Sequence, residues 1–70
     1  MENKKLFVEA LKVAFMVGDD DRYRPALWFV EYRVKDGQEW LFDSRCGVDR
    51  VNVTGCSCAA IAEAIIGNFL

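Results

Sequence analysis

Residues 26–46 decide the fold, with the sequence ALWFVEYRV (26–34), KDGQ (35–38) and EWLFDSRC (39–46). This stretch holds both tryptophans and two of the five phenylalanines, the side chains that bury the most apolar area when a chain folds. Two runs rich in aromatic and β-branched residues flank a turn dipeptide, Asp36-Gly37, which is typical of a β-hairpin. The segment predicts two antiparallel strands, 26–34 and 39–46, as the centre of the protein.

The register of this hairpin follows from which side chains would share a face. A two-residue turn would set Asp43 opposite Val30 and mix charged with apolar residues on the same face. A three-residue loop, with Gly37 in the left-handed region, separates the two kinds of side chain. We therefore expect the three-residue loop and an inner, core-facing row of Trp28, Val30, Tyr32, Val34, Trp40, Phe42, Ser44 and Cys46.

The opposite face of the predicted hairpin combines an apolar patch with a charged rim. The patch consists of Leu27, Phe29 and Leu41. The rim consists of Glu31, Arg33, Asp43 and Arg45. An apolar patch surrounded by charges has the composition of a protein interface, although the N-terminal segment or a second copy of the chain, as in a homodimer, would cover it equally well.

The flanking segments predict two helices and a third strand. Residues 4–17 favour a helix begun by Asn3 and closed before Gly18, with a strand over 5–17 as the alternative, because short apolar runs discriminate poorly. Residues 48–53 alternate weakly as a short strand with Val51 and Val53 inward. The alanine-rich residues 57–66 form the second helix, capped by Thr54 or Ser57. The fold class is α+β, with a three-stranded antiparallel sheet and a C-terminal helix (β-β-β-α if 5–17 is a strand).

Composition limits the class of protein. Seventy residues suffice for one small domain (1–70), and an apolar fraction of 53% indicates a folded chain. The net charge of −2 does not suit direct binding to nucleic acid, which relies on clustered Lys and Arg. No segment has the length of a membrane span or the pattern of a signal peptide. We expect a cytoplasmic protein without membrane contact.

Few residues invite a catalytic or metal-binding hypothesis. The sequence has no histidine, the commonest general base and metal ligand. Cys56 and Cys58 flank a predicted helix start, where a thiolate is stabilised, so a thiol redox or metal module is one alternative. The run Asp19, Asp20 and Asp21 lacks the spacing of a calcium loop. We expect no enzymatic activity, no cofactor and no resident metal.

These observations favour a non-catalytic protein-protein interaction module that occupies a surface on a larger protein or ribonucleoprotein complex. A phage or mobile-element inhibitor of a host defence or nuclease complex, similar in role to an anti-CRISPR protein, is the most specific form of this hypothesis. An acidic mimic of nucleic acid is a further alternative. The predicted partner-binding residues are the apolar patch, two residues of its rim and the acidic loop: Leu27, Phe29, Leu41, Glu31, Arg33, Asp19, Asp20, Asp21 and Tyr23.

Overall fold

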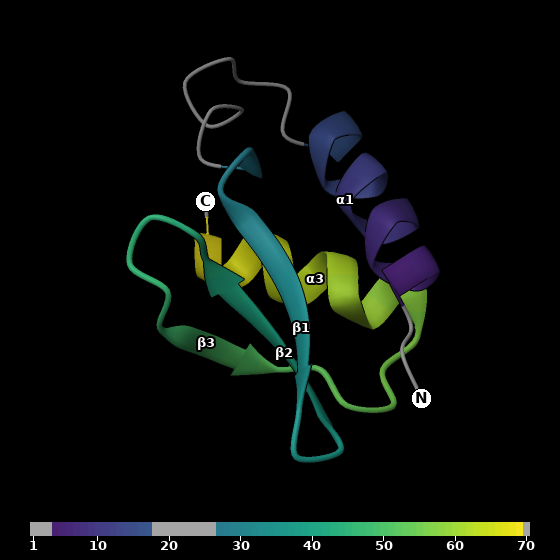
Figure 1. The fold of residues 1–70 in the computed structure, drawn as a ribbon. Coiled ribbons are helices and arrows are strands. Elements are labelled where there is room, and N and C mark those ends of the chain that lie inside the picture. Colours follow the sequence, from purple (N-terminus) through teal and green to yellow (C-terminus); the bar gives the residue numbers. More distant parts are fainter. Residues whose placement is uncertain (1–3, 18–26, 70) are drawn as a thin grey trace.

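The computed structural model of the chain describes residues 4–17 and 27–69, and Figure 1 shows an α+β arrangement. The elements, in chain order, are α1 (Lys4–Val17), β1 (Val30–Lys35), β2 (Gln38–Asp43), β3 (Asp49–Asn52) and α3 (Cys58–Phe69). The predicted fold class is confirmed: a three-stranded antiparallel sheet, a C-terminal helix and an N-terminal helix are all present. The alternative of a strand over residues 5–17 is wrong. Asn3 and Gly18, the predicted ends of the first helix, lie outside the described residues.

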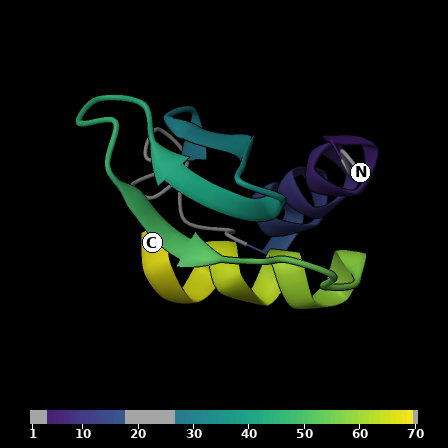
Figure 2. The same ribbon diagram turned by 60° about the horizontal axis from the view of Figure 1, so that its bottom comes forward.

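The molecule has two layers. The strands lie in the order β1-β2-β3, so β2 is the central strand. Both helices lie on one side of the sheet and pack against each other, α3 beneath it and α1 at one end (Figures 1 and 2). Among the described elements, none covers the other side, which we call the outer face.

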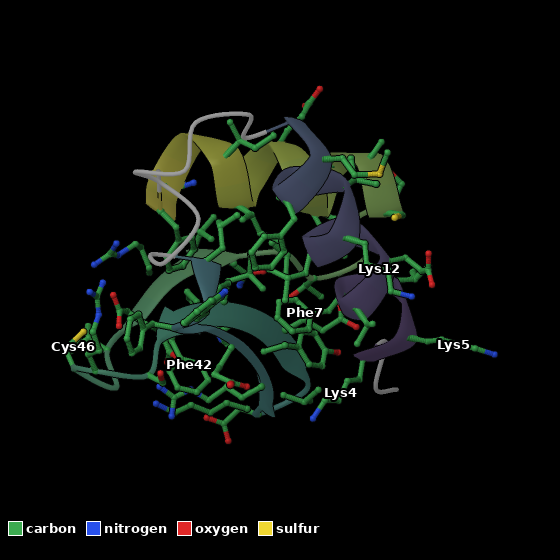
Figure 3. The ribbon with its side chains drawn as sticks, turned by 90° about the horizontal axis from the view of Figure 1, so that it is seen from above. Lys4, Lys5, Phe7, Lys12, Phe42 and Cys46 are labelled. Carbon is green, nitrogen blue, oxygen red and sulfur yellow. The ribbon has the colours of Figure 1, made fainter. Side chains whose placement is uncertain are left out.

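The hydrophobic core fills the space between the sheet and the helices. Phe7 of α1 points towards the sheet, where its ring stacks on Tyr32 of β1 with 5.7 Å between the centroids (Figure 3). The two alanines one and two turns further along α1, Ala10 and Ala14, are fully buried, so the backbones of the two helices approach closely. The buried apolar residues are Phe7, Ala10, Ala14, Leu27, Val30, Tyr32, Leu41, Val53, Ile61, Ala62, Ile65 and Phe69.

The last helix is held at both ends by side chains. The Ser57 hydroxyl accepts a hydrogen bond from the backbone N–H of Ala60 at 3.2 Å, as an N-cap does. At the other end the Arg50 guanidinium lies over the ring of Phe69 and donates to the carbonyl of Asn68. Arg50 reaches this far because the pairs Leu41–Val51 and Phe42–Asp49 leave it as an extra residue in β3. The helix therefore continues to Phe69, beyond the predicted end at residue 66.

The predicted register of the hairpin is wrong by one residue. Val30 pairs with Asp43, Tyr32 with Leu41 and Val34 with Glu39, because the turn contains two residues instead of three. Asp36 and Gly37 have φ angles of 53° and 76°, the left-handed pair that defines a type I′ turn. The twist of this turn matches that of the flanking strands, which makes it the favoured short connection.

The one-residue shift exchanges the faces of β2. Leu41, predicted to be outside, is fully buried, and Leu27 is buried with it. Trp40 and Phe42, predicted to be inside, lie on the outer face opposite Arg33 and Glu31. Four further residues predicted to face the core are exposed, so the prediction is wrong for them as well: Trp28 (71%), Val34 (41%), Ser44 and Cys46. The apolar patch of Leu27, Phe29 and Leu41 therefore does not exist as a surface feature.

Replacing Gly37 with alanine tests the importance of the turn. An L-residue in the left-handed region costs about 1–2 kcal/mol, so Gly37→Ala should lower the free energy of unfolding in urea by about that amount. Gly67→Ala is the matched control, because Gly67 lies inside α3 with open space around its Cα. The control should stabilise the protein by up to about 1 kcal/mol. Equal effects of the two substitutions would argue against the type I′ turn.

Candidate functional site

The outer face is the candidate functional surface. Its members follow from strand pairing, since residues directly opposite each other in a sheet share a face. Figure 3 places Phe42 on the side of the sheet away from the helices. The outer-face residues are Glu31, Arg33 and Lys35 of β1, Gln38, Trp40 and Phe42 of β2, and Asp49 and Asn52 of β3.

Arg33 lies across all three strands of this face. Its guanidinium carbon is 3.9 Å from the centroid of the Phe42 ring, and its Nε donates to Oδ1 of Asp49 at 2.6 Å. A second guanidinium nitrogen, Nη2, donates to the carbonyl of Gly47 in the loop before β3. These contacts hold the planar guanidinium in one orientation on the aromatic ring.

A second arginine, Arg45, also contacts both an aromatic ring and a carboxylate, at the end of the hairpin. The Arg45 guanidinium lies over the ring of Phe29, 4.4 Å from its centroid. Its Nε and Nη2 both donate to the carboxylate of Asp43, and the backbone N–H of Arg45 donates to Oδ1 at 2.9 Å. These hydrogen bonds lower the pKa of Asp43 from 3.8 to about 2. Asp43 is therefore held ionised although its side chain is almost fully covered.

The other buried carboxylate, Glu39, connects the hairpin to the segment before α3. Its carboxylate accepts hydrogen bonds from the Tyr32 hydroxyl and from the backbone N–H of Gly55, both at 3.2 Å. Its own backbone N–H donates to the Thr54 hydroxyl at 2.8 Å. Thr54 thus supports the sheet, and Ser57 alone of the two predicted candidates caps α3.

A shallow hollow of about 230 Å³ lies on the outer face near the hairpin turn. Trp40 lines it together with two charged side chains that interact weakly, since Nζ of Lys35 is 3.8 Å from Oδ2 of Asp49. The lining residues are Lys35, Asp36, Gln38, Trp40 and Asp49. The hollow offers one aromatic surface with acids, a base and an amide around it, which suits the side chain of a docking partner more than a buried small molecule.

The structure separates the predicted partner-binding residues into three groups. Leu27 and Leu41 belong to the core. Glu31 is exposed and Arg33 half-buried on the outer face, with Phe29 half-buried beneath Arg45. Asp19, Asp20, Asp21 and Tyr23 lie outside the described residues.

Sequence reasoning missed the remaining members of the outer face, namely Lys35, Gln38, Trp40, Phe42, Asp49 and Asn52. One signal for them was present in the chain. Asp-Gly is one of the dipeptides that two-residue type I′ turns prefer. A prediction based on this turn, instead of on the separation of polar from apolar residues, would have placed Trp40 and Phe42 on the outer face.

The cysteines occupy separate surroundings. Cys46 is exposed in the turn after β2, whereas Cys56 and Cys58 are half-buried beside the core, and all three are free thiols. Within residues 4–17 and 27–69, no three Cys, Asp or Glu side chains are grouped so that they could hold a metal ion. In the same ranges no helix has the length and hydropathy needed to cross a membrane.

Comparisons with known proteins found no match: no family model fits the chain, and neither a curated protein nor a solved structure resembles it.

Acid titration tests the contact between Arg45 and Asp43. Because the folded pKa of Asp43, about 2, lies below its ordinary value of 3.8, this carboxylate stabilises the fold above about pH 4 and the contribution is lost as the pH falls towards 2. Carbon-detected NMR should show the Asp43 carboxyl titrating near pH 2. In Arg45→Ala the midpoint should rise towards the ordinary value, and an unchanged midpoint would contradict the assignment.

The contact between Arg33 and Asp49 should appear in a double-mutant cycle. Arg33→Ala, Asp49→Ala and the double variant should give a coupling free energy of about 0.5–1 kcal/mol in urea unfolding, since the pair is only partly exposed. Glu9 and Lys12 of α1 are the matched control. Their side chains are 60% and 66% exposed, so their coupling should stay near a few tenths of a kcal/mol. Coupling at Arg33–Asp49 no larger than in this control would show that the arginine is not held as described.

Proposed function

We propose that this protein is a non-catalytic binding module whose outer face docks on a larger macromolecular partner. The observation that supports this most strongly is the position of Trp40 and Phe42. Both rings belong to the central strand and are half-buried on the outer face, where Phe42 lies on the side of the sheet away from the helices (Figure 3) and Trp40 shares its face through strand pairing. Tryptophan and arginine are the residues that most often dominate the binding energy of protein interfaces.

The fixed arginine strengthens the proposal. Binding usually requires long side chains to lose rotamer freedom at a cost of about 0.5–1.5 kcal/mol each. Arg33 is already held by Asp49, Gly47 and the Phe42 ring, so less of this cost remains to be met when a partner arrives. A preorganised arginine beside two aromatic rings suits recognition of a specific protein surface.

The charges of the outer face favour a protein partner over a nucleic acid. Glu31, Asp36 and Asp49 offset Arg33 and Lys35, and both bases lie within 4.0 Å of Asp49. A surface that binds a phosphate backbone needs uncompensated Lys and Arg. We propose that the partner is a larger protein or ribonucleoprotein complex, contacted through its protein surface. Obstruction of a host defence or nuclease complex by a phage or mobile-element protein is the specific form of this activity that we favour.

Site-specific photo-crosslinking tests the proposal. A photo-reactive phenylalanine analogue at the exposed position Glu31 on the outer face should capture a partner in a lysate of the cell that makes the protein. The same analogue at Glu63, exposed on α3, is the control and should not capture it. In the background of Trp40→Ala, capture at position 31 should fall about tenfold or more.

Circular dichroism of each variant establishes that it remains folded. Equal capture from positions 31 and 63, or undiminished capture by a folded Trp40→Ala variant, would disprove the outer face as the binding surface.

A further inference from the structure

The exposed side of α1 is unusually apolar for the outside of a helix. Met16 is 79% exposed, and Leu6, Val8 and Val13 are between 37% and 42% exposed. The exposed polar residues on the same helix are three lysines and one acid: Lys4, Lys5, Glu9 and Lys12. A helix that only faced water would carry mostly polar residues of both charges on this side.

Three of the four exposed apolar residues, Leu6, Val13 and Met16, lie with the acid Glu9 at the spacing of a helix-binding seam, and Val8 lies outside it. Leu6, Glu9, Val13 and Met16 stand three, four and three residues apart, which is the a/d pattern of a coiled coil. From Leu6 to Met16, ten residues further along the chain, a helix rises by about 15 Å, so the seam is long and narrow. Its shape suits another helix that lies along α1.

Two lysines run along one flank of this seam. Lys5 and Lys12 are seven residues apart and extend from α1 away from the sheet and α3 (Figure 3). Glu9 within the seam is close to Lys12, with 3.5 Å between Oε1 and Nζ. The net charge of this side is therefore positive in a chain whose total charge is −2. Flanking charges in such seams select a partner of opposite sign.

We infer that the exposed side of α1 binds an acidic amphipathic helix of another protein. The apolar residues of that helix would cover Leu6, Val13 and Met16, and its Glu or Asp residues would face Lys5 and Lys12. This surface is separate from the outer face of the sheet, because the hydrophobic core lies between α1 and the sheet.

A second copy of the chain fits this seam poorly. In an antiparallel pair of α1 helices, the lysine flanks of the two copies would face each other. In a parallel pair, the lysine flank of each copy would face the Ala10 side of the other copy. That side is not accessible, because Ala10 is fully buried in the core of its own chain. A lipid surface also fits poorly, because Glu9 lies in the middle of the seam and the overall negative charge opposes anionic lipids.

NMR titration of the full chain with designed peptides tests the inference. The probe is a helical peptide of about three heptads with Leu and Ile at a and d and Glu at e and g. The control peptide carries Lys in place of every Glu. The acidic peptide should shift the amide signals of α1 and bind at least about tenfold more tightly than the basic one, because only the acidic peptide complements the lysine flank.

Variants of the protein locate the binding. Val13→Asp should weaken the acidic peptide about tenfold, whereas Val48→Asp should not, since Val48 is an equally apolar residue, 65% exposed, in the loop between β2 and β3. Lys12→Glu should weaken the acidic peptide and strengthen the basic one. This reversal depends on charge complementarity and would not arise from a general loss of stability.

Four outcomes would overturn the inference. The acidic peptide could shift signals only outside α1, or it could bind Val13→Asp as tightly as the unaltered protein. The unaltered protein could sediment as a dimer that Val13→Asp dissociates, which would assign the seam to a second copy. The unaltered protein could also bind vesicles of phosphatidylcholine and phosphatidylglycerol without binding either peptide, which would assign the seam to a lipid surface.

Discussion

The type I′ turn at Asp36-Gly37 is the constraint on which the rest of the structure depends. Both residues adopt the left-handed conformation, and the two-residue connection aligns Tyr32 with Leu41 across the hairpin. Because side chains alternate along a strand, this alignment determines the face on which every residue of β2 lies. The core under the helices and the rings on the outer face both follow from it.

This register places two carboxylates, Glu39 and Asp43, on the buried side of the sheet. A polar group without partners is costly to bury, and the fold compensates with hydrogen bonds from Tyr32 within the hairpin and from residues outside its strands. Arg45, in the turn after β2, binds Asp43 through its backbone and its guanidinium. Gly55, after β3, donates to Glu39. The two loops therefore add to the stability of the register that the turn sets.

The two layers give the protein surfaces of different chemistry. The outer face presents arginine and aromatic side chains, with Arg33 fixed across the three strands. Its acidic and basic residues nearly balance in charge. The exposed side of α1 presents apolar residues beside lysines. We propose the first as a docking surface for a folded protein and the second as a binding surface for an acidic helix.

The sequence by itself determined the elements and their class. Helical spacing of apolar residues predicted α1 and α3, and the aromatic runs around Asp36-Gly37 predicted the hairpin, because these signals depend on near neighbours along the chain. Only the tertiary structure decided which side of β2 is buried. The observed register buries the carboxylates of Glu39 and Asp43, and two residues that donate hydrogen bonds to them, Arg45 and Gly55, lie outside the hairpin strands. The predicted surface patch failed for that reason, while Glu31 and Arg33, whose outward direction follows from β1, remained on the candidate site.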